Sequence, residues 1–177
     1  SASVAVNSLR LGRDNAGSME AFAAKMTIRA AELGALNTKF RNPHGLHHPE
    51  HYTTARDLAL ITRAAMQQPL FRRIVGTITY PWYSESAGPR ELWNHNRLLR
   101  SFPGCTGVKT GYTNPAQHTL ASAALWGTRE MISVVMHSTK QGKWDDSKLL
   151  LTYGHSHAPT LDAPAAAPTS TAAVQAE

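Results

Sequence analysis

The 177-residue chain has 42% hydrophobic residues, enough to bury the core of one globular domain, and it contains no apolar run near the ~20 residues that span a bilayer. Its net charge of +6 favours an anionic partner, but lysine and arginine are scattered rather than clustered, which argues against nucleic-acid binding. The single cysteine, Cys105, excludes an internal disulfide, and because no Cys-His protease signature surrounds it we interpret it as a packed thiol.

The first half of the chain predicts two helices. Ser18 is suited to cap the first, which we expect to end at Gly34. Thr54 and Asp57 form a capping box for the second, which ends before Pro69. The apolar side of the first helix is predicted to comprise Phe22, Met26, Ile28, Ala30 and Leu33.

From residue 74 onward the pattern is typical of strands. Residues 75–80 alternate as a strand that Pro81 ends, residues 84–90 form a loop, and residues 91–99 return in an extended conformation. Pro103-Gly104 then turns the chain into a strand containing Lys109. Residues 119–125 and 131–136 follow as an antiparallel pair joined around Gly127-Thr128.

A final helix is predicted over residues 144–153. Leu149, Leu150 and Tyr153 are expected to face inward, with Gly154 closing the helix. The order of elements predicts an α+β fold with helices packed on an antiparallel sheet. We expect one domain over residues 1–154, followed over 155–177 by an Ala/Pro-rich linker or disordered tail.

The tripeptide Lys109-Thr110-Gly111 carries the clearest chemical signal. In a strand, Lys109 and Gly111 share one face and Thr110 points to the other. Lys109 then supplies positive charge for a carboxylate, and Gly111 lets an extended peptide lie along the strand edge. The alternative is a solvent-facing lysine and a structural glycine.

In its context this tripeptide resembles a motif of a known family. The chain is similar to the serine-type D-alanyl-D-alanine carboxypeptidases, the penicillin-binding peptidase S11 family, from about Gly17 to Gly154. The resemblance rests on residues 17–22 (GSMEAF), 36–40 (LNTKF), 44–46 (HGL), 52–59 (YTTARDLA), 94–99 (NHNRLL) and 107–113 (GVKTGYT). It implies the β-lactamase/DD-peptidase-like transpeptidase fold, present here in part.

The same resemblance assigns roles to residues. Lys109, Thr110 and Gly111 correspond to the catalytic Lys-Thr-Gly motif, with Tyr112, Thr113 and His44 as candidate substrate-binding residues. Asn96 and Arg97 are interpreted as structural. No metal and no organic cofactor are implied. The implied partners are a peptidoglycan pentapeptide or D-Ala-D-Ala end and β-lactam antibiotics.

Two other family motifs are absent from this sequence. It contains neither Ser-x-x-Lys, which provides the nucleophile and its activating lysine, nor Ser-x-Asn. Ser1-Ala2-Ser3 is a candidate remnant of the latter, which makes Ser1 a candidate catalytic residue. We expect the chain to be a piece whose N-terminal part is missing or lies on another polypeptide. A degenerate family member is the alternative.

A histidine-rich loop offers a rival site. His44, His47, His48, Glu50 and His51 are metal-ligand types, and the spacing of His47 and His51 suits a shared metal on a helix. Pro49 disfavours that helix, so a solvated loop is the preferred interpretation.

The sequence therefore leaves three hypotheses for function. The first is a serine-type D-Ala-D-Ala carboxypeptidase that forms an acyl-enzyme. The second is a binding module for wall peptides that does not cleave them. A β-lactamase is the third, although the flanking blocks suit the carboxypeptidases better. The resemblance implies a periplasmic or secreted location, with any membrane association through segments not present here.

Overall fold

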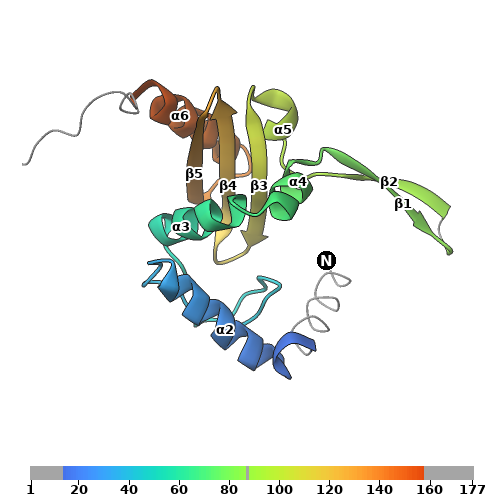
Figure 1. Ribbon diagram of the computed structural model, residues 1–177, viewed down its shortest axis with the longest axis vertical. Coiled ribbons are helices and arrows are strands. Elements are labelled where there is room, and N and C mark those ends of the chain that lie inside the picture. The colour runs from blue at the N-terminus through green and yellow to red at the C-terminus, as the bar shows by residue number, and fades with distance from the viewer. Residues whose placement is uncertain (1–13, 87, 158–177) are drawn as a thin grey trace, which may run out of the picture.

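The computed structural model describes residues 14–86 and 88–157 (Figure 1). Its elements in chain order are α2 (Met19–Glu32), α3 (Ala55–Met66), α4 (Pro69–Gly76), β1 (Thr79–Ser84), β2 (Gly88–Trp93), α5 (Leu98–Ser101), β3 (Cys105–Thr113), β4 (Gln117–Trp126), β5 (Arg129–Ser138) and α6 (Gly142–His157). The predicted α+β class is confirmed.

The centre of the fold is an antiparallel sheet in the order β3-β4-β5 (Figure 1). The predicted hairpin around Gly127-Thr128 is confirmed, since Trp126 pairs with Arg129. Helices α3 and α4 cover one face of the sheet and α6 covers the other (Figure 1). One core cluster joins Met66, Val75, Val108, Ala121 and Ala123, and a second joins Leu98, Leu120 and Trp144.

Both predicted helix starts are confirmed. The Ser18 hydroxyl accepts from the Ala21 amide at 3.1 Å, and the Thr54 hydroxyl accepts from the Asp57 amide at 3.1 Å. Gly34 follows α2 with φ +84°, a left-handed conformation that favours glycine. The predicted apolar side of α2 is wrong in part: Ala30 is buried, but Ile28 is 60% exposed.

The prediction for residues 75–99 is largely wrong. Pro69 occupies the first turn of a new helix, α4, where its missing N–H costs nothing, so residues 75 and 76 are helical. Pro81 lies within β1 rather than ending it, paired with Glu91 of β2 in a separate two-stranded ribbon where proline is tolerated. Strand β2 begins at Gly88, inside the predicted loop, and residues 98–101 form the short helix α5 instead of an extended segment.

The last helix exists as predicted but faces the other way. Leu149, Leu150 and Tyr153 are 70%, 46% and 59% exposed, whereas Trp144 and Leu151 are buried. Gly154 does not close the helix, which continues to His157. The predicted domain boundary at 154–155 therefore falls within α6, and residues 158–177 of the predicted tail lie outside the described residues. Cys105 is half-buried against the second core cluster, which confirms a packed thiol.

Among the helices of the described segments, none is both long enough and apolar enough to span a bilayer.

Candidate functional site

A cleft of about 820 Å³ opens at the outer edge of β3. In the described part of the chain, β3 pairs with β4 alone, so its other edge is free of strand partners. Four consecutive residues of β3 line the cleft, and the remaining walls come from the loop before α3, from the segment around α5 and from the start of α6. The lining residues are His44, Leu46, Trp93, Asn94, His95, Arg97, Arg100, Lys109, Thr110, Gly111, Tyr112, His118, Lys140, Lys143 and Trp144.

Lys109, a candidate catalytic residue, lines the cleft. Its Nζ donates to the Thr110 carbonyl oxygen at 2.6 Å. Although the residue is exposed overall, the protein atoms around its ammonium group partly desolvate it, and this lowers the pKa of Lys109. A lysine held in this way at a free strand edge can bind a carboxylate more strongly than a fully hydrated one.

Gly111 is required by the packing of β3 against β4, a contact that cannot be read from the sequence. Gly111 pairs with Thr119 on β4, and a Cβ at position 111 would lie 2.5 Å from the Thr119 Oγ1. The neighbouring Thr113, a predicted substrate-binding residue, uses its hydroxyl to accept from the Ala116 amide at 3.2 Å, and it does not line the cleft.

The structure adds Lys143, which sequence reasoning missed. Its side chain lies at the start of α6, 7% exposed, with Nζ 3.3 Å from Nδ1 of His118 and 4.7 Å from the centroid of the Trp144 ring. Burial lowers the pKa of Lys143, and the nearby charges of Arg97, Lys140 and Lys109 lower it further.

His118 is the nearest polar partner of Lys143 and was also missed. Burial, with the charges of Lys143 and Lys140, lowers its pKa, which favours a neutral ring whose Nδ1 can accept from the lysine. The ring of Tyr112, a predicted substrate-binding residue, lies over His118 with 4.5 Å between centroids. These contacts join β3, β4 and α6 into one wall of the cleft.

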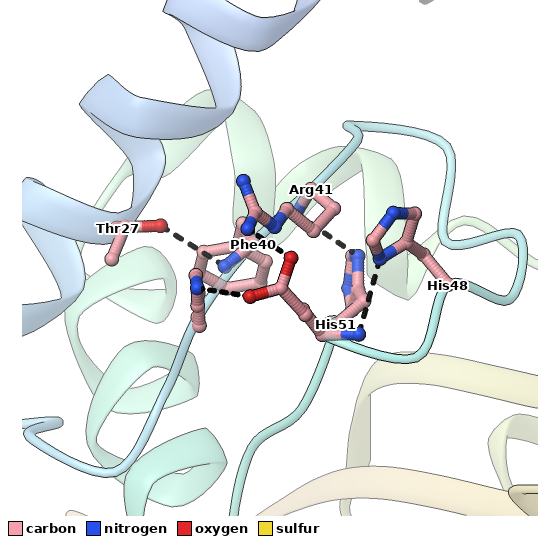
Figure 2. A network of polar contacts seen from close by, with 7 residues as sticks. Thr27, Phe40, Arg41, His48 and His51 are labelled. Atoms are coloured by element: carbon pink, nitrogen blue, oxygen red, sulfur yellow. Dashed lines mark hydrogen bonds and ion pairs between the residues drawn. The ribbon is translucent and has the colours of Figure 1, made fainter.

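His44 lines the cleft from the loop before α3. A polar network holds this loop (Figure 2). The Thr27 hydroxyl accepts from the Phe40 amide at 3.0 Å, and His51 Nδ1 accepts from the Arg41 amide at 3.3 Å. Glu50 pairs with both Lys39 and Arg41, which holds the pKa of its carboxyl below the ordinary value. The loop that carries His44 is therefore fixed to α2 and to the segment before α3.

Two further histidines of the loop accept local hydrogen bonds. Nδ1 of His44 accepts from the Leu46 amide and Nδ1 of His48 accepts from the Glu50 amide, each at 3.1 Å. Within the described ranges, no three His, Cys, Asp or Glu residues come together in a way that could hold a metal ion.

Ser1 lies outside the described residues. Asn96 is structural, as predicted: it is buried, and its Oδ1 accepts from the Leu98 amide at 3.1 Å. Arg97, which we also interpreted as structural, is exposed and lines the cleft.

The chain is similar to proteins of known function. The family model described as D-alanyl-D-alanine carboxypeptidase, Peptidase S11, matches residues 2–140. The D-alanyl-D-alanine carboxypeptidase DacF of Bacillus subtilis is 39% identical over 121 residues, covering 67% of this chain and 31% of the relative. DacB2 of Mycobacterium tuberculosis is 37% identical over 144 residues, covering 78% of this chain and 49% of the relative. The chain thus spans about a third to a half of the curated relatives it matches.

Solved structures give the same result. A D-alanyl-D-alanine carboxypeptidase from Mycobacterium tuberculosis superposes with a TM-score of 0.77 at 35% identity, covering 86% of this chain and 59% of that one. The Streptomyces K15 DD-transpeptidase superposes with a TM-score of 0.70 at 34% identity, covering 77% and 54%. The predicted DD-peptidase-like fold is therefore confirmed.

Proposed function

Because the chain belongs to the D-alanyl-D-alanine carboxypeptidase family, peptidase S11, we propose that its cleft recognises the D-Ala-D-Ala end of a peptidoglycan stem peptide. This recognition is the substrate-binding step of a serine-type D-Ala-D-Ala carboxypeptidase. β-Lactam antibiotics would occupy the same cleft, since acylation by penicillins is the inhibitory side reaction that the family resemblance implies.

One observation carries the proposal: Lys109 lies in the cleft at the free edge of β3. An extended peptide can pair with the backbone of an edge strand, which gives affinity without depending on its side chains. The carboxylate at the peptide's end would then meet the Lys109 ammonium, with the Thr110 hydroxyl as a second donor. Gly111 leaves no side chain of its own along the bound peptide.

Lys143 supports the same assignment. A buried ammonium group is costly unless it is paired, and with the described residues Lys143 makes no ion pair to an acid. A carboxylate entering the cleft would offset that cost. In this proposal Lys143 is a positioning charge near the peptide terminus. The neutral ring of His118 holds its ammonium group in place.

The nucleophile is not assigned to this chain, because its sequence contains no Ser-x-x-Lys. Its residues would supply binding and electrostatic stabilisation, and the serine that forms the acyl-enzyme would have to come from outside this sequence. The same observation favours a second candidate function, a module that binds wall peptides without cleaving them. The family resemblance implies work outside the cytoplasmic membrane, so we place this protein in the periplasm or outside the cell.

Incubation of the purified chain with benzylpenicillin tests whether a nucleophile is present. We expect its intact mass to remain unchanged, because no serine here has the activating lysine of the motif. DacF of Bacillus subtilis serves as the acylation control. A gain of one drug mass by this chain would show that one of its own serines reacts, and the assignment would then be wrong.

A further inference from the structure

The cleft carries more positive charge than one terminal carboxylate can neutralise. Its lining contains no Asp or Glu, and none of its lysines or arginines forms an ion pair within the described ranges. These cations are Arg97, Arg100, Lys109, Lys140 and Lys143. A concave surface lined by one sign of charge concentrates ligands of the opposite sign.

Arg97, the residue just before α5, forms a pair with Arg100 inside that short helix. They are three residues apart at a helical turn, so both can project toward the same side. The Arg97 Cζ lies 5.9 Å from the ring centroid of Trp144, and the Arg100 Cζ lies 5.2 Å from that of Trp93. An indole that holds a guanidinium group in this way orders it and leaves its N–H groups available for a carboxylate.

The pair is separate from the strand that carries Lys109, and it is not needed for the terminal carboxylate. Lys109 and Lys143 already supply two ammonium groups for that single charge. Lys143 lies within Coulomb range of Arg97, Lys140 and Lys109, so the cationic lining is one continuous electrostatic surface.

We propose that Arg97 and Arg100, with Lys140, form a second anion site that takes an additional carboxylate on the substrate. The preferred substrate is therefore a dianionic peptide, with one carboxylate at its D-Ala end and another on an upstream side chain. The inference rests on the proposed function, because it places the D-Ala carboxylate at Lys109. A peptide with an amine in place of the second carboxylate is disfavoured by the same charges.

Three matched peptides test the proposal on the full 177-residue chain. N-acetyl-L-Glu-D-Ala-D-Ala and N-acetyl-L-Gln-D-Ala-D-Ala are nearly isosteric and differ in the charge of one side chain. N-acetyl-L-Lys-D-Ala-D-Ala places a longer, positively charged side chain at the same position. Calorimetric titration at low ionic strength is expected to show the Glu peptide binding about three- to tenfold more tightly than the Gln peptide, and the Lys peptide most weakly.

Substitutions test whether the preference for the Glu peptide comes from Arg97 and Arg100. The double substitution Arg97→Gln with Arg100→Gln is expected to bring the Glu and Gln peptides to within about twofold of each other, because Lys140 is then the one remaining charge of the second anion site. Arg63→Gln removes one charge from the exposed side of α3, outside the cleft, and is expected to leave the ratio unchanged.

The same titrations test the second anion site and D-Ala-D-Ala recognition separately. Equal dissociation constants for the three peptides, or a Glu preference that survives in the double variant, would overturn the second anion site while leaving D-Ala-D-Ala recognition intact. Failure of all three peptides to bind would overturn both.

Discussion

Replacing Lys109 with Gln is expected to weaken the binding of N-acetyl-D-Ala-D-Ala by about 10- to 100-fold, the loss of a charge-assisted hydrogen bond worth ~1.5–3 kcal/mol. The glutamine keeps much of the side chain's length and its hydrogen-bonding capacity but removes the charge. Calorimetric titration of the wild-type and variant chains measures the change. Lys148→Gln is the matched control, because Lys148 lies on α6 outside the lining of the cleft.

The pH dependence of this binding follows from the same residue. Partial desolvation of the ammonium group lowers the pKa of Lys109. The side chain therefore loses its proton, and its charge, at a lower pH than a fully hydrated lysine. Peptide affinity is therefore expected to fall as the pH rises through that lowered pKa. The Lys109→Gln variant is expected to show a smaller decline, because only Lys143 then loses its charge near the carboxylate. A variant that binds the peptide as tightly as the wild type would exclude Lys109 from the site.

Replacing Asp57 with Ala is expected to lower the melting temperature by about 6–12 °C, because two hydrogen bonds to a buried carboxylate are lost. Asp57 is fully buried at the start of α3. Its Oδ2 accepts from the Asn37 amide at 2.7 Å and from the Thr38 hydroxyl at 2.8 Å. The carboxylate thus fastens the segment that leads into the His44 loop, and thermal unfolding followed by circular dichroism measures its loss.

Two further variants make this result specific. Asp57→Asn keeps an oxygen acceptor in place and is expected to cost about half as much. Asp145→Ala removes an exposed aspartate of α6 and is expected to change the melting temperature by no more than about 2 °C. A melting temperature for Asp57→Ala equal to that of Asp145→Ala would contradict a fastening role.

Asp57 also predicts how stability depends on pH. Burial alone raises its pKa, but the hydrogen bonds from Thr38 and Asn37 outweigh burial, so the pKa lies below the ordinary value. The stabilisation is present above the pKa of the unfolded chain and is lost as pH falls through the lower pKa of the folded protein. Asp57→Asn should remove that part of the acid dependence.

The elements with local signals were predictable from the sequence. Ser18 and Thr54 mark helix starts because their hydroxyls cap backbone amides, and the turn at Gly127-Thr128 fixes the pairing of β4 with β5. The segment between residues 69 and 101 was not predictable in the same way. Pro69 both follows one helix and begins the next, and β1 with β2 forms a ribbon apart from the main sheet, so Pro81 breaks no central ladder.

The residues of the candidate site also differ in whether the sequence alone could identify them. Lys109, Thr110 and Gly111 were identified from a contiguous motif within recognisable flanking blocks. Lys143 and His118 were missed because they are 25 residues apart and meet only when α6 packs against β4. The one available signal was the pair of lysines at 140 and 143, spaced to share a side at the start of a helix.

Titration of the isotope-labelled chain with N-acetyl-D-Ala-D-Ala, followed by NMR, tests most directly whether this cleft recognises a D-Ala-D-Ala end. N-acetyl-L-Ala-L-Ala, which has the same composition and charge, is the control. We expect the D,D-peptide to cause saturable chemical-shift changes in the amides of Lys109 to Tyr112 and in the indole of Trp144. The L,L-peptide is expected to cause much weaker changes. Identical responses to the two peptides, or shifts confined to residues away from β3, would contradict it.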